Sequence, residues 1–474
     1  MQKGFALITK LLAKIYGNFS REELVRTLLL GAAFAIIIGT YWTLRPLKDA
    51  LFKAIVIGDG LHTDASYLAW AKIISVCVLV PLVIFYSHLV DKFKRQSLFY
   101  LIGGFAICGL LVFSLLFSHQ ILGLHNKVAH PGRLLGWFWY VFVEAYGSLL
   151  IALFWAYAAD VVDAQTAKKA FPLIVMVGQL GGIIGPQATD LPAIMEFDTC
   201  APLVAGCAFT TLAVLIIIRL FASRLSRHPM PDAAETATFS KTGAREKTGF
   251  VEGLRLLFTQ RYLLGIFLVV AFYEIIVTIF DFNFKRLVFQ STIGDKATAE
   301  VLGDFGTAVN LVSFLCLVFG IGNVQRRLGM KVALCAMPFI IGSMVVGFKL
   351  APSLAVLFWI MVAGKALNYA LNSPSLKQLY IPTSPTAKYK TQAWIEMFGA
   401  RGAKAGGSLV NTLLKVFQTR AGSVAAGFAM YVTFASIFSG VLLVGWFFVA
   451  LYLAREYDRR VNVRPENDLK KQNV

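Results

Sequence analysis

Two pairs of basic residues lie inside apolar sequence. Arg45 and Lys48 stand three residues apart at the end of one apolar stretch, and Arg401 and Lys404 have the same spacing in a glycine-rich stretch. An ionisable side chain at the centre of a membrane helix costs roughly 2.5–3.5 kcal/mol on insertion scales, so it usually faces a cavity or pairs with another charge. Residues three apart share one helix face. We expect the two pairs to face each other across a cavity suited to a multiply charged anion such as a nucleotide polyphosphate. For Arg45 and Lys48 the alternative is a snorkelling helix end neutralised by Asp49.

Acidic residues also occur within apolar sequence. Glu144 is therefore a candidate for substrate binding, with an interhelical ion pair of structural value as the alternative. Glu274, Asp281 and Lys285 fall in one later stretch, and Asp281 and Lys285, four residues apart, share a helix face. A local ion pair is the alternative for these two. We expect Asp281 to hold Lys285 in an empty site and to release it when phosphate arrives.

Glycines and aromatic residues close to these charges are predicted to serve packing. The glycines around Arg401 lack the strand-then-helix context of a phosphate loop, so close helix packing is the favoured interpretation. The same holds for Gly178, Gly181, Gly182 and Gly185. Six aromatic residues could stack a nucleobase, although core packing or a membrane-interface belt explains such residues more often. They are Trp137, Trp139, Tyr140, Tyr146, Phe154 and Trp155.

The elements that position these residues are predicted to be membrane-spanning helices. Hydrophobic residues make up 57% of the 474 residues and charged residues 15%, which is typical of an integral membrane protein. A spanning helix needs ~20 mainly apolar residues, and about twelve such blocks occur. The predicted spans are 27–46, 66–88, 97–118, 134–158, 169–189, 202–222, 263–283, 302–322, 332–350, 353–373, 392–416 and 425–452.

The distribution of charge predicts the topology. The net charge is +19, but the basic residues cluster in alternate connections and do not form one soluble nucleic-acid-binding domain. Both termini are therefore predicted to be cytoplasmic, in a multi-pass protein of a bacterial inner membrane. No removable signal peptide is expected. The predicted parts are an amphipathic cytosolic segment (1–26), a six-helix half (27–222), a cytosolic linker (223–261), a second six-helix half (262–452) and a basic cytosolic tail (453–474).

An internal repeat supports this division into halves. Met176-x-Gly178-x-x-Gly181 recurs as Met397-x-Gly399-x-x-Gly402, and Leu47-Lys48-x-x-x-Phe52 is echoed by Phe284-Lys285-x-x-x-Phe289. Parallel six-helix repeats are the plan of major-facilitator-type transporters, whose substrate site lies between the halves. The sequence therefore predicts an all-α integral membrane protein of this type.

Four segments carry a further likeness. They are Leu44-Arg45-Pro46-Leu47-Lys48-Asp49-Ala50-Leu51, Glu144-Ala145-Tyr146-Gly147-Ser148, Tyr380-Ile381-Pro382 and Gly399-x-Arg401-x-x-Lys404-x-Gly406-Gly407-Ser408-Leu409. With them the chain resembles, over nearly its whole length, the nucleotide transporter family of plastids and intracellular bacteria, the ATP/ADP translocases. The resemblance implies exchange or symport of purine nucleotides, with Lys48, Glu144 and Lys404 important for transport. Asp281 takes the place of the family's Glu in a Glu-x-x-x-Lys segment.

The sequence departs from the family pattern at Gly58-Asp59-Gly60, Lys377 and Gln392. ATP/ADP exchange by alternating access is the favoured function. A proton-coupled nucleotide or NAD transporter, or a porter for another organic anion or a lysophospholipid, is the alternative within transport. A non-transporting scaffold or receptor is the alternative from another class. The expected partners are nucleotide and lipid bilayer, and nothing in the sequence specifies an oligomeric state. The sequence shows no metal cluster, nucleophile elbow or nucleotide-hydrolysing loop, so we expect neither an enzyme nor a cofactor.

Overall fold

The structure is a computed structural model of the chain. It describes residues 19–60, 64–162, 164–224, 250–318, 323–383 and 391–472. Most of the predicted amino-terminal segment, most of the 223–261 linker and the last two residues of the tail lie outside these ranges. Within the described residues every regular element is a helix, which confirms the all-α class.

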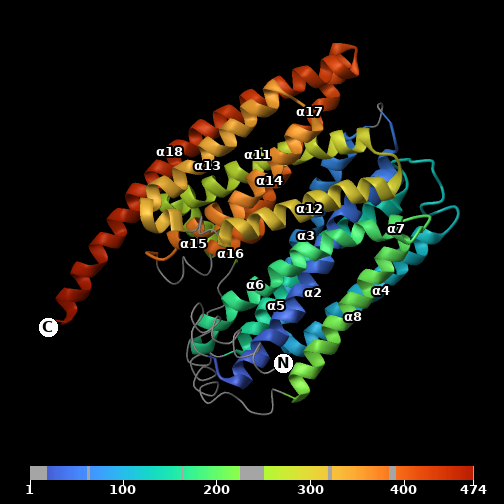
Figure 1. Cartoon of the computed structure of the whole chain (residues 1–474). Coiled ribbons are helices and arrows are strands. Elements are labelled where there is room, and N and C mark those ends of the chain that lie inside the picture. Colours follow the sequence, from blue (N-terminus) through green and yellow to red (C-terminus); the bar gives the residue numbers. More distant parts are fainter. Residues whose placement is uncertain are drawn as a thin grey trace. The chain divides into compact units, whose positions relative to one another are not determined.

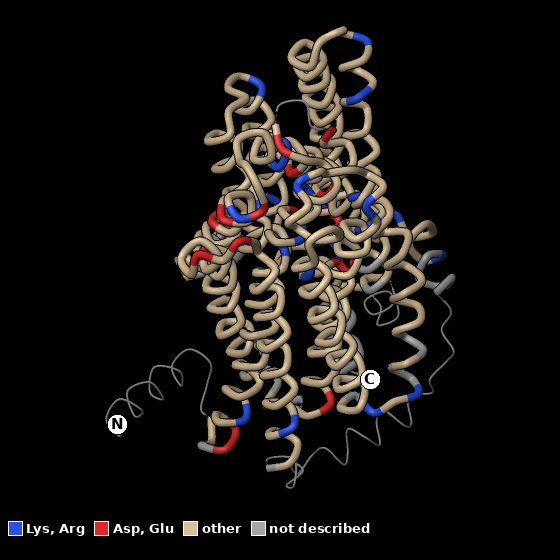
Figure 2. The backbone as a smooth tube through the Cα atoms, turned by 90° about the vertical axis from the view of Figure 1, so that its right-hand side faces the viewer, with Lys and Arg blue, Asp and Glu red and all other residues tan. Residues whose placement is uncertain are grey.

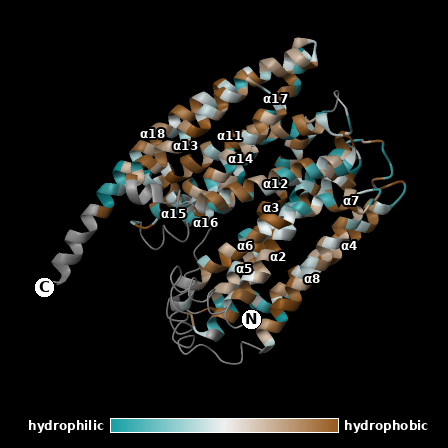
Figure 3. Cartoon of the chain, viewed as in Figure 1, coloured by the Kyte–Doolittle hydropathy of each residue, from teal (hydrophilic) through white to brown (hydrophobic). Residues whose placement is uncertain are grey.

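Eleven helices of the described chain are long and apolar enough to cross a membrane. Hydrophobic residues predominate along them (Figure 3), and most of their length carries neither Lys, Arg, Asp nor Glu (Figure 2). The predicted span 392–416 is not among the eleven. It is built from a short helix, a π-helical turn and α17 (Ala400–Ala421), and α17 is too polar to qualify because it contains Arg401, Lys404 and Lys415.

The chain forms two compact units, which are not separated at the linker alone. The first unit consists of Met1–Asp59, Val78–Glu246 and Thr292–Thr307, and the second of the remaining residues. Two long helices therefore belong to both units, α3 (Ser66–Lys92) and α12 (Gly294–Val318). The first unit thus includes Thr292–Thr307 from the second sequence half, and the second unit includes Gly60–Cys77 from the first sequence half.

The first unit is a bundle around α2 (Figure 1). Its elements are α2 (Arg21–Phe52), η1 (Lys53–Ile57), α4 (Arg95–Ser118), α5 (Leu134–Val161), α6 (Ala164–Gln187), η2 (Ala188–Asp190), α7 (Leu191–Ile194) and α8 (Ala201–Arg224). Ser20 and Glu23 form a reciprocal capping box at the start of α2. A Cβ atom on Gly181 would lie 1.9 Å from the Ala35 carbonyl oxygen, so only glycine allows α6 to approach α2 this closely. This contact confirms the packing role predicted for Gly181.

The second unit is built around α11 (Arg261–Ser291). Its other elements are α10 (Phe250–Thr259), α13 (Asn323–Leu350), α14 (Leu354–Leu367), η3 (Asn368–Asn372), α15 (Ser373–Leu379), α16 (Gln392–Trp394), η5 (Ile395–Gly399), α17 and α18 (Val424–Gln472). The close approach of α17 to α11 occurs at Gly407, where an added Cβ would lie 2.8 Å from the Ile275 carbonyl oxygen. Gly402, the repeat counterpart of Gly181, has open space at that position instead.

Candidate functional site

Lys48 and Glu144, which were predicted separately, form an ion pair in the first unit. Lys48 projects from α2 and is buried, with 4% of its surface exposed. Its ammonium group donates a hydrogen bond to the Glu144 carboxylate from α5 and lies 4.3 Å from the centre of the Tyr140 ring. The Glu144 side chain remains 31% exposed, so the pair is accessible from one side. The partner that the structure shows for Lys48 is thus Glu144 and not Asp49.

Arg45 lies one turn before Lys48 on α2 and is half-buried. Its guanidinium carbon is 4.8 Å from the centre of the Trp42 ring, a cation–π distance. The prediction that both cations lie on one helix is therefore confirmed. Their neighbours differ, because Lys48 contacts Glu144 and Tyr140 whereas Arg45 contacts Trp42.

The aromatic residues of α5 are largely core residues, as predicted. Trp139 and Phe154 are fully buried, and Trp139 packs edge-on against Phe117 at 5.1 Å. Phe154 stacks on Phe34 of α2 at 4.6 Å between ring centres. These contacts hold α5 against its neighbours and so fix the position of Glu144.

A second charged group surrounds Asp281 in the second unit. Its carboxylate binds three lysines: Lys72 of α3 at 2.8 Å, Lys285 of α11 at 3.0 Å and Lys365 of α14 at 3.0 Å. Asp281, Lys285 and Lys365 are buried, each with 6% of its surface exposed. We call these four residues the Asp281 cluster. The predicted pair of Asp281 with Lys285 is therefore present as one part of a larger group.

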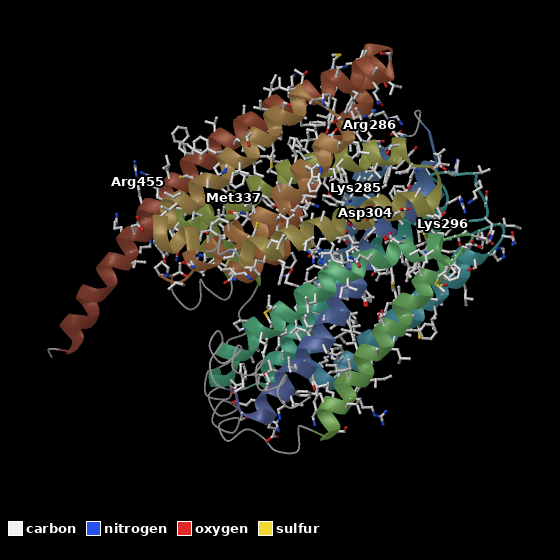
Figure 4. All side chains as sticks on the ribbon, viewed as in Figure 1. Lys285, Arg286, Lys296, Asp304, Met337 and Arg455 are labelled. Atoms are coloured by element: carbon white, nitrogen blue, oxygen red, sulfur yellow. The ribbon has the colours of Figure 1, made fainter. Side chains whose placement is uncertain are left out.

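The Asp281 cluster has a formal charge of +2, from three lysines and one aspartate. Taking charges out of water is costly, so a group with an excess of one sign inside a membrane protein is suited to binding the opposite sign. Arg286, the next residue after Lys285 on α11 (Figure 4), is also buried. Its guanidinium lies 4.0 Å from the centre of the Phe428 ring. This end of α11 is therefore strongly basic.

Lys404 lies near another acid of α11, Glu274. The Lys404 ammonium is 3.6 Å from the Glu274 carboxylate, and the Lys404 side chain is 50% exposed, so the pair is loose. Arg401 is half-buried on the same helix. Glu274 and Asp281 are seven residues apart, which places them on one face of α11, about 10 Å apart along its axis. The expected approach of Arg401 and Lys404 to Arg45 and Lys48 concerns both units and stays a prediction.

The sequence reasoning missed Lys72 and Lys365. One signal could have found Lys365: Met176 and Met397 are 221 residues apart in the repeat, and so are Glu144 and Lys365. The first unit pairs Lys48 of α2 with an acid of α5, and the second pairs an acid of α11 with Lys365 of α14. By the repeat, Lys48 corresponds to Lys285 and Glu144 to Lys365, so the counterpart of the first unit's ion pair is two lysines that share Asp281. Nothing in the sequence pattern points to Lys72.

Lys53 was also missed, and it explains one departure from the family pattern. It is fully buried in η1, and its ammonium binds the Asp59 carboxylate at 2.8 Å and the Thr292 carbonyl at 2.7 Å. The backbone N–H of Gly294 also donates to Asp59. Asp59 in the Gly58-Asp59-Gly60 stretch therefore neutralises a buried lysine and fixes the start of α12.

The chain is similar in sequence to known transporters. A sequence model of the "TLC ATP/ADP transporter" family matches residues 2–358 and 352–457. ADP,ATP carrier protein 1 of Rickettsia bellii is 24% identical over 497 residues, covering 95% of this chain and 97% of that protein. ADP,ATP carrier protein 3 of the same organism is 22% identical over 505 residues, covering 94% and 97%.

Solved structures show the fold. A bacterial homologue of the iron transporter ferroportin in an inward-facing state superposes with a TM-score of 0.61 at 13% identity, covering 90% of this chain and 98% of that one. The peptide transporter POT in complex with sulfate gives 0.59 at 13% identity, covering 90% and 95%. The fold is thus major-facilitator-like, and because the family's sequence model spans nearly the whole chain, the chain belongs to the TLC ATP/ADP transporter family.

Proposed function

We propose that this protein is a secondary transporter that exchanges ATP for ADP across a membrane by alternating access. The observation that carries the proposal is the Asp281 cluster, in which three lysines surround one buried carboxylate. A nucleotide polyphosphate can replace that carboxylate as the partner of the ammonium groups, because both present anionic oxygens to the same donors. Family membership and the names of the Rickettsia relatives support this substrate.

The proposed substrate-binding residues belong to two sets. Arg45, Lys48 and Glu144 lie in the first unit, and Asp281, Lys285, Arg401 and Lys404 in the second. To the second set we add Lys72 and Lys365. No catalytic step is part of the proposal, since alternating access requires only that the site open to each side in turn. A scaffold or receptor has no need for so many buried charges, whose insertion into a membrane is costly.

The test is uptake of radiolabelled ATP into proteoliposomes that contain the purified full-length protein. We expect internal ADP to accelerate uptake strongly, because an exchanger returns to the outside only when loaded. GTP, CTP and NAD, tested in the same way, define the substrate range. Uptake that proceeds without internal nucleotide and follows an imposed proton gradient would support proton-coupled transport instead. No nucleotide uptake in either assay would reject nucleotide transport.

We also propose that both termini and the 223–261 linker face the cytoplasm of a bacterium whose inner membrane holds the protein. The support is the excess of Lys and Arg in these parts of the sequence. In a variant without native cysteines, single cysteines introduced at Thr238 and Asn473 should resist an impermeant thiol reagent added to intact cells. They should react after the cells are opened. Labelling in intact cells would contradict this topology. Both positions lie outside the described residues.

A further inference from the structure

A cavity of about 320 Å³ lies within the second unit. Its charged and amide lining residues are Glu274, Asn368, Asn372, Lys377, Glu396 and Lys404. This volume is at the lower end of the range of small-molecule sites, about 300–1,000 Å³. Two π-helical turns, η3 and η5, border the cavity and contribute lining residues. Single π-helical turns occur frequently at functional sites.

The charges of this cavity are balanced. Glu274 and Glu396 contribute two negative charges, and Lys377 and Lys404 contribute two positive charges. A balanced lining gives no net attraction for a multiply charged anion, whereas the Asp281 cluster carries +2. The cavity is therefore better suited to a neutral group that forms hydrogen bonds.

Two asparagines provide such hydrogen bonds. Asn372 is buried, with 2% of its surface exposed, and its Nδ2 donates to Asn368 Oδ1 at 2.8 Å. Asn372 Oδ1 is buried and has no hydrogen-bond partner within the described part of the chain. A buried polar atom without a partner is unfavourable, so this oxygen calls for a donor from a ligand. The remaining Asn368 amide hydrogens can donate to the same ligand.

The position of the asparagines relative to the Asp281 cluster follows from their helix. Asn368 and Asn372 come three and seven residues after Lys365, so all three lie near one face of α14 and η3. Glu274 of the cavity and Asp281 likewise share one face of α11. The cavity and the Asp281 cluster therefore lie along the same pair of elements within the second unit.

We propose that this cavity binds the base of the nucleotide, with the phosphates directed to the Asp281 cluster, an inference that rests on the proposed nucleotide transport. Asn372 accepts a hydrogen bond from the exocyclic amine of adenine, and Asn368 donates to the adjacent ring nitrogen. Asparagine pairs with adenine through this donor–acceptor edge in protein–DNA complexes. Hypoxanthine has a carbonyl in place of that amine, which sets an oxygen against Asn372 Oδ1.

The experiment measures inhibition of radiolabelled ATP uptake by unlabelled ATP, inosine triphosphate and inorganic tripolyphosphate. Wild-type protein should bind ATP about tenfold or more tightly than inosine triphosphate, since an unpaired buried polar group opposes the latter. Asn372→Leu should weaken ATP binding about tenfold and bring the two nucleotides to similar affinity. Tripolyphosphate should inhibit both proteins equally, because it lacks a base.

Two further variants keep the test decisive. Asn368→Ala changes a half-buried residue and should also reduce the preference for ATP over inosine triphosphate. It provides the test even if Asn372→Leu does not fold. Asn411→Leu is the matched control: Asn411 is fully buried on α17, but its amide is already used by the Thr278 carbonyl and the Tyr431 hydroxyl. This control should keep the wild-type preference, whatever its stability.

Thermal stabilisation of the purified protein by the same nucleotides measures binding without transport. Equal stabilisation of wild-type protein by ATP and inosine triphosphate would overturn the base site, and so would an unchanged preference in both cavity variants. Neither result affects the proposed exchange, which is judged by uptake of ATP into ADP-loaded vesicles. A lack of exchange alongside a clear preference for ATP in binding would reject exchange and retain the base site.

Discussion

Lys48→Ala should reduce the kcat/KM of ATP exchange by about 10- to 150-fold, because a hydrogen bond to a charged group contributes about 1.5–3 kcal/mol. Lys48 is buried on α2 and bound to Glu144, whose side chain remains partly exposed. An incoming phosphate can therefore reach the pair and compete with the carboxylate for the ammonium group. Without Lys48, Glu144 remains in the site and repels the same phosphate. Uptake into ADP-loaded proteoliposomes at equal protein content measures the effect.

The control for Lys48→Ala must separate substrate binding from a structural ion pair. The double variant Lys48→Glu, Glu144→Lys keeps an ion pair between α2 and α5, so its thermal stability should approach that of wild-type protein. Its exchange should stay low, because the cation now projects from α5. Recovery of exchange in the double variant would show that only the ion pair matters. Lys94→Ala removes an exposed lysine screened by bulk salt and should have no effect.

The helices could be predicted from the sequence because bilayer thickness imposes a length that apolar composition reveals. Eleven predicted spans correspond to long apolar helices. The span 392–416 does not, because it contains several charged residues, and it includes the π-helical turn η5. The exchange of segments between the units was not predictable. Helix length and hydrophobicity say nothing about which bundle each end of α3 or α12 joins. That choice depends on packing between residues far apart in sequence.

The charged residues of the site were predicted one at a time, and their partners were not. Lys48 and Glu144 were both identified because each is costly in an apolar segment, yet nothing local indicates that they meet across 96 positions of sequence. The pair of Asp281 with Lys285 was predictable because their spacing of four residues is set by the helix itself. Lys72 and Lys365 come from other helices, and only tertiary packing brings them to Asp281.

Asp281 has the most informative substitution in the second unit, because it is the acid shared by three lysines. Asp281→Asn removes the anion that competes with phosphate for these ammonium groups. We expect nucleotide binding to be retained or strengthened and exchange to slow by about tenfold or more, since losing a competing charged hydrogen bond of about 1.5–3 kcal/mol hinders release. Asp281→Glu should remain active, because the negative charge survives. Equilibrium nucleotide binding and initial exchange rates, measured on the same preparations, separate the two effects.

Asp64→Asn is the matched control for this substitution. Asp64 also binds a lysine of the second unit, at 2.7 Å, but the Lys415 side chain is 62% exposed. Exposed ion pairs contribute little, about 0–1 kcal/mol, so this variant should exchange nucleotides at the wild-type rate. Asp281→Asn leaves three ammonium groups around a neutral amide, and their mutual repulsion should lower the thermal stability of the empty protein. Added tripolyphosphate should restore that stability if the cluster binds phosphate.

A proton carried by Asp281 is the rival explanation for a slow Asp281→Asn variant, since a carboxylate in a membrane helix can titrate. The two explanations differ in their response to an imposed pH gradient. If the Asp281 carboxylate only binds the three lysines until phosphate replaces it, wild-type exchange should depend little on the gradient, because no proton crosses with the nucleotide. If Asp281 carries the coupled proton, the gradient should drive wild-type uptake strongly, and Asp281→Asn should remove that dependence. A variant with wild-type exchange rate, nucleotide affinity and pH response would reduce Asp281 to a structural partner of its three lysines.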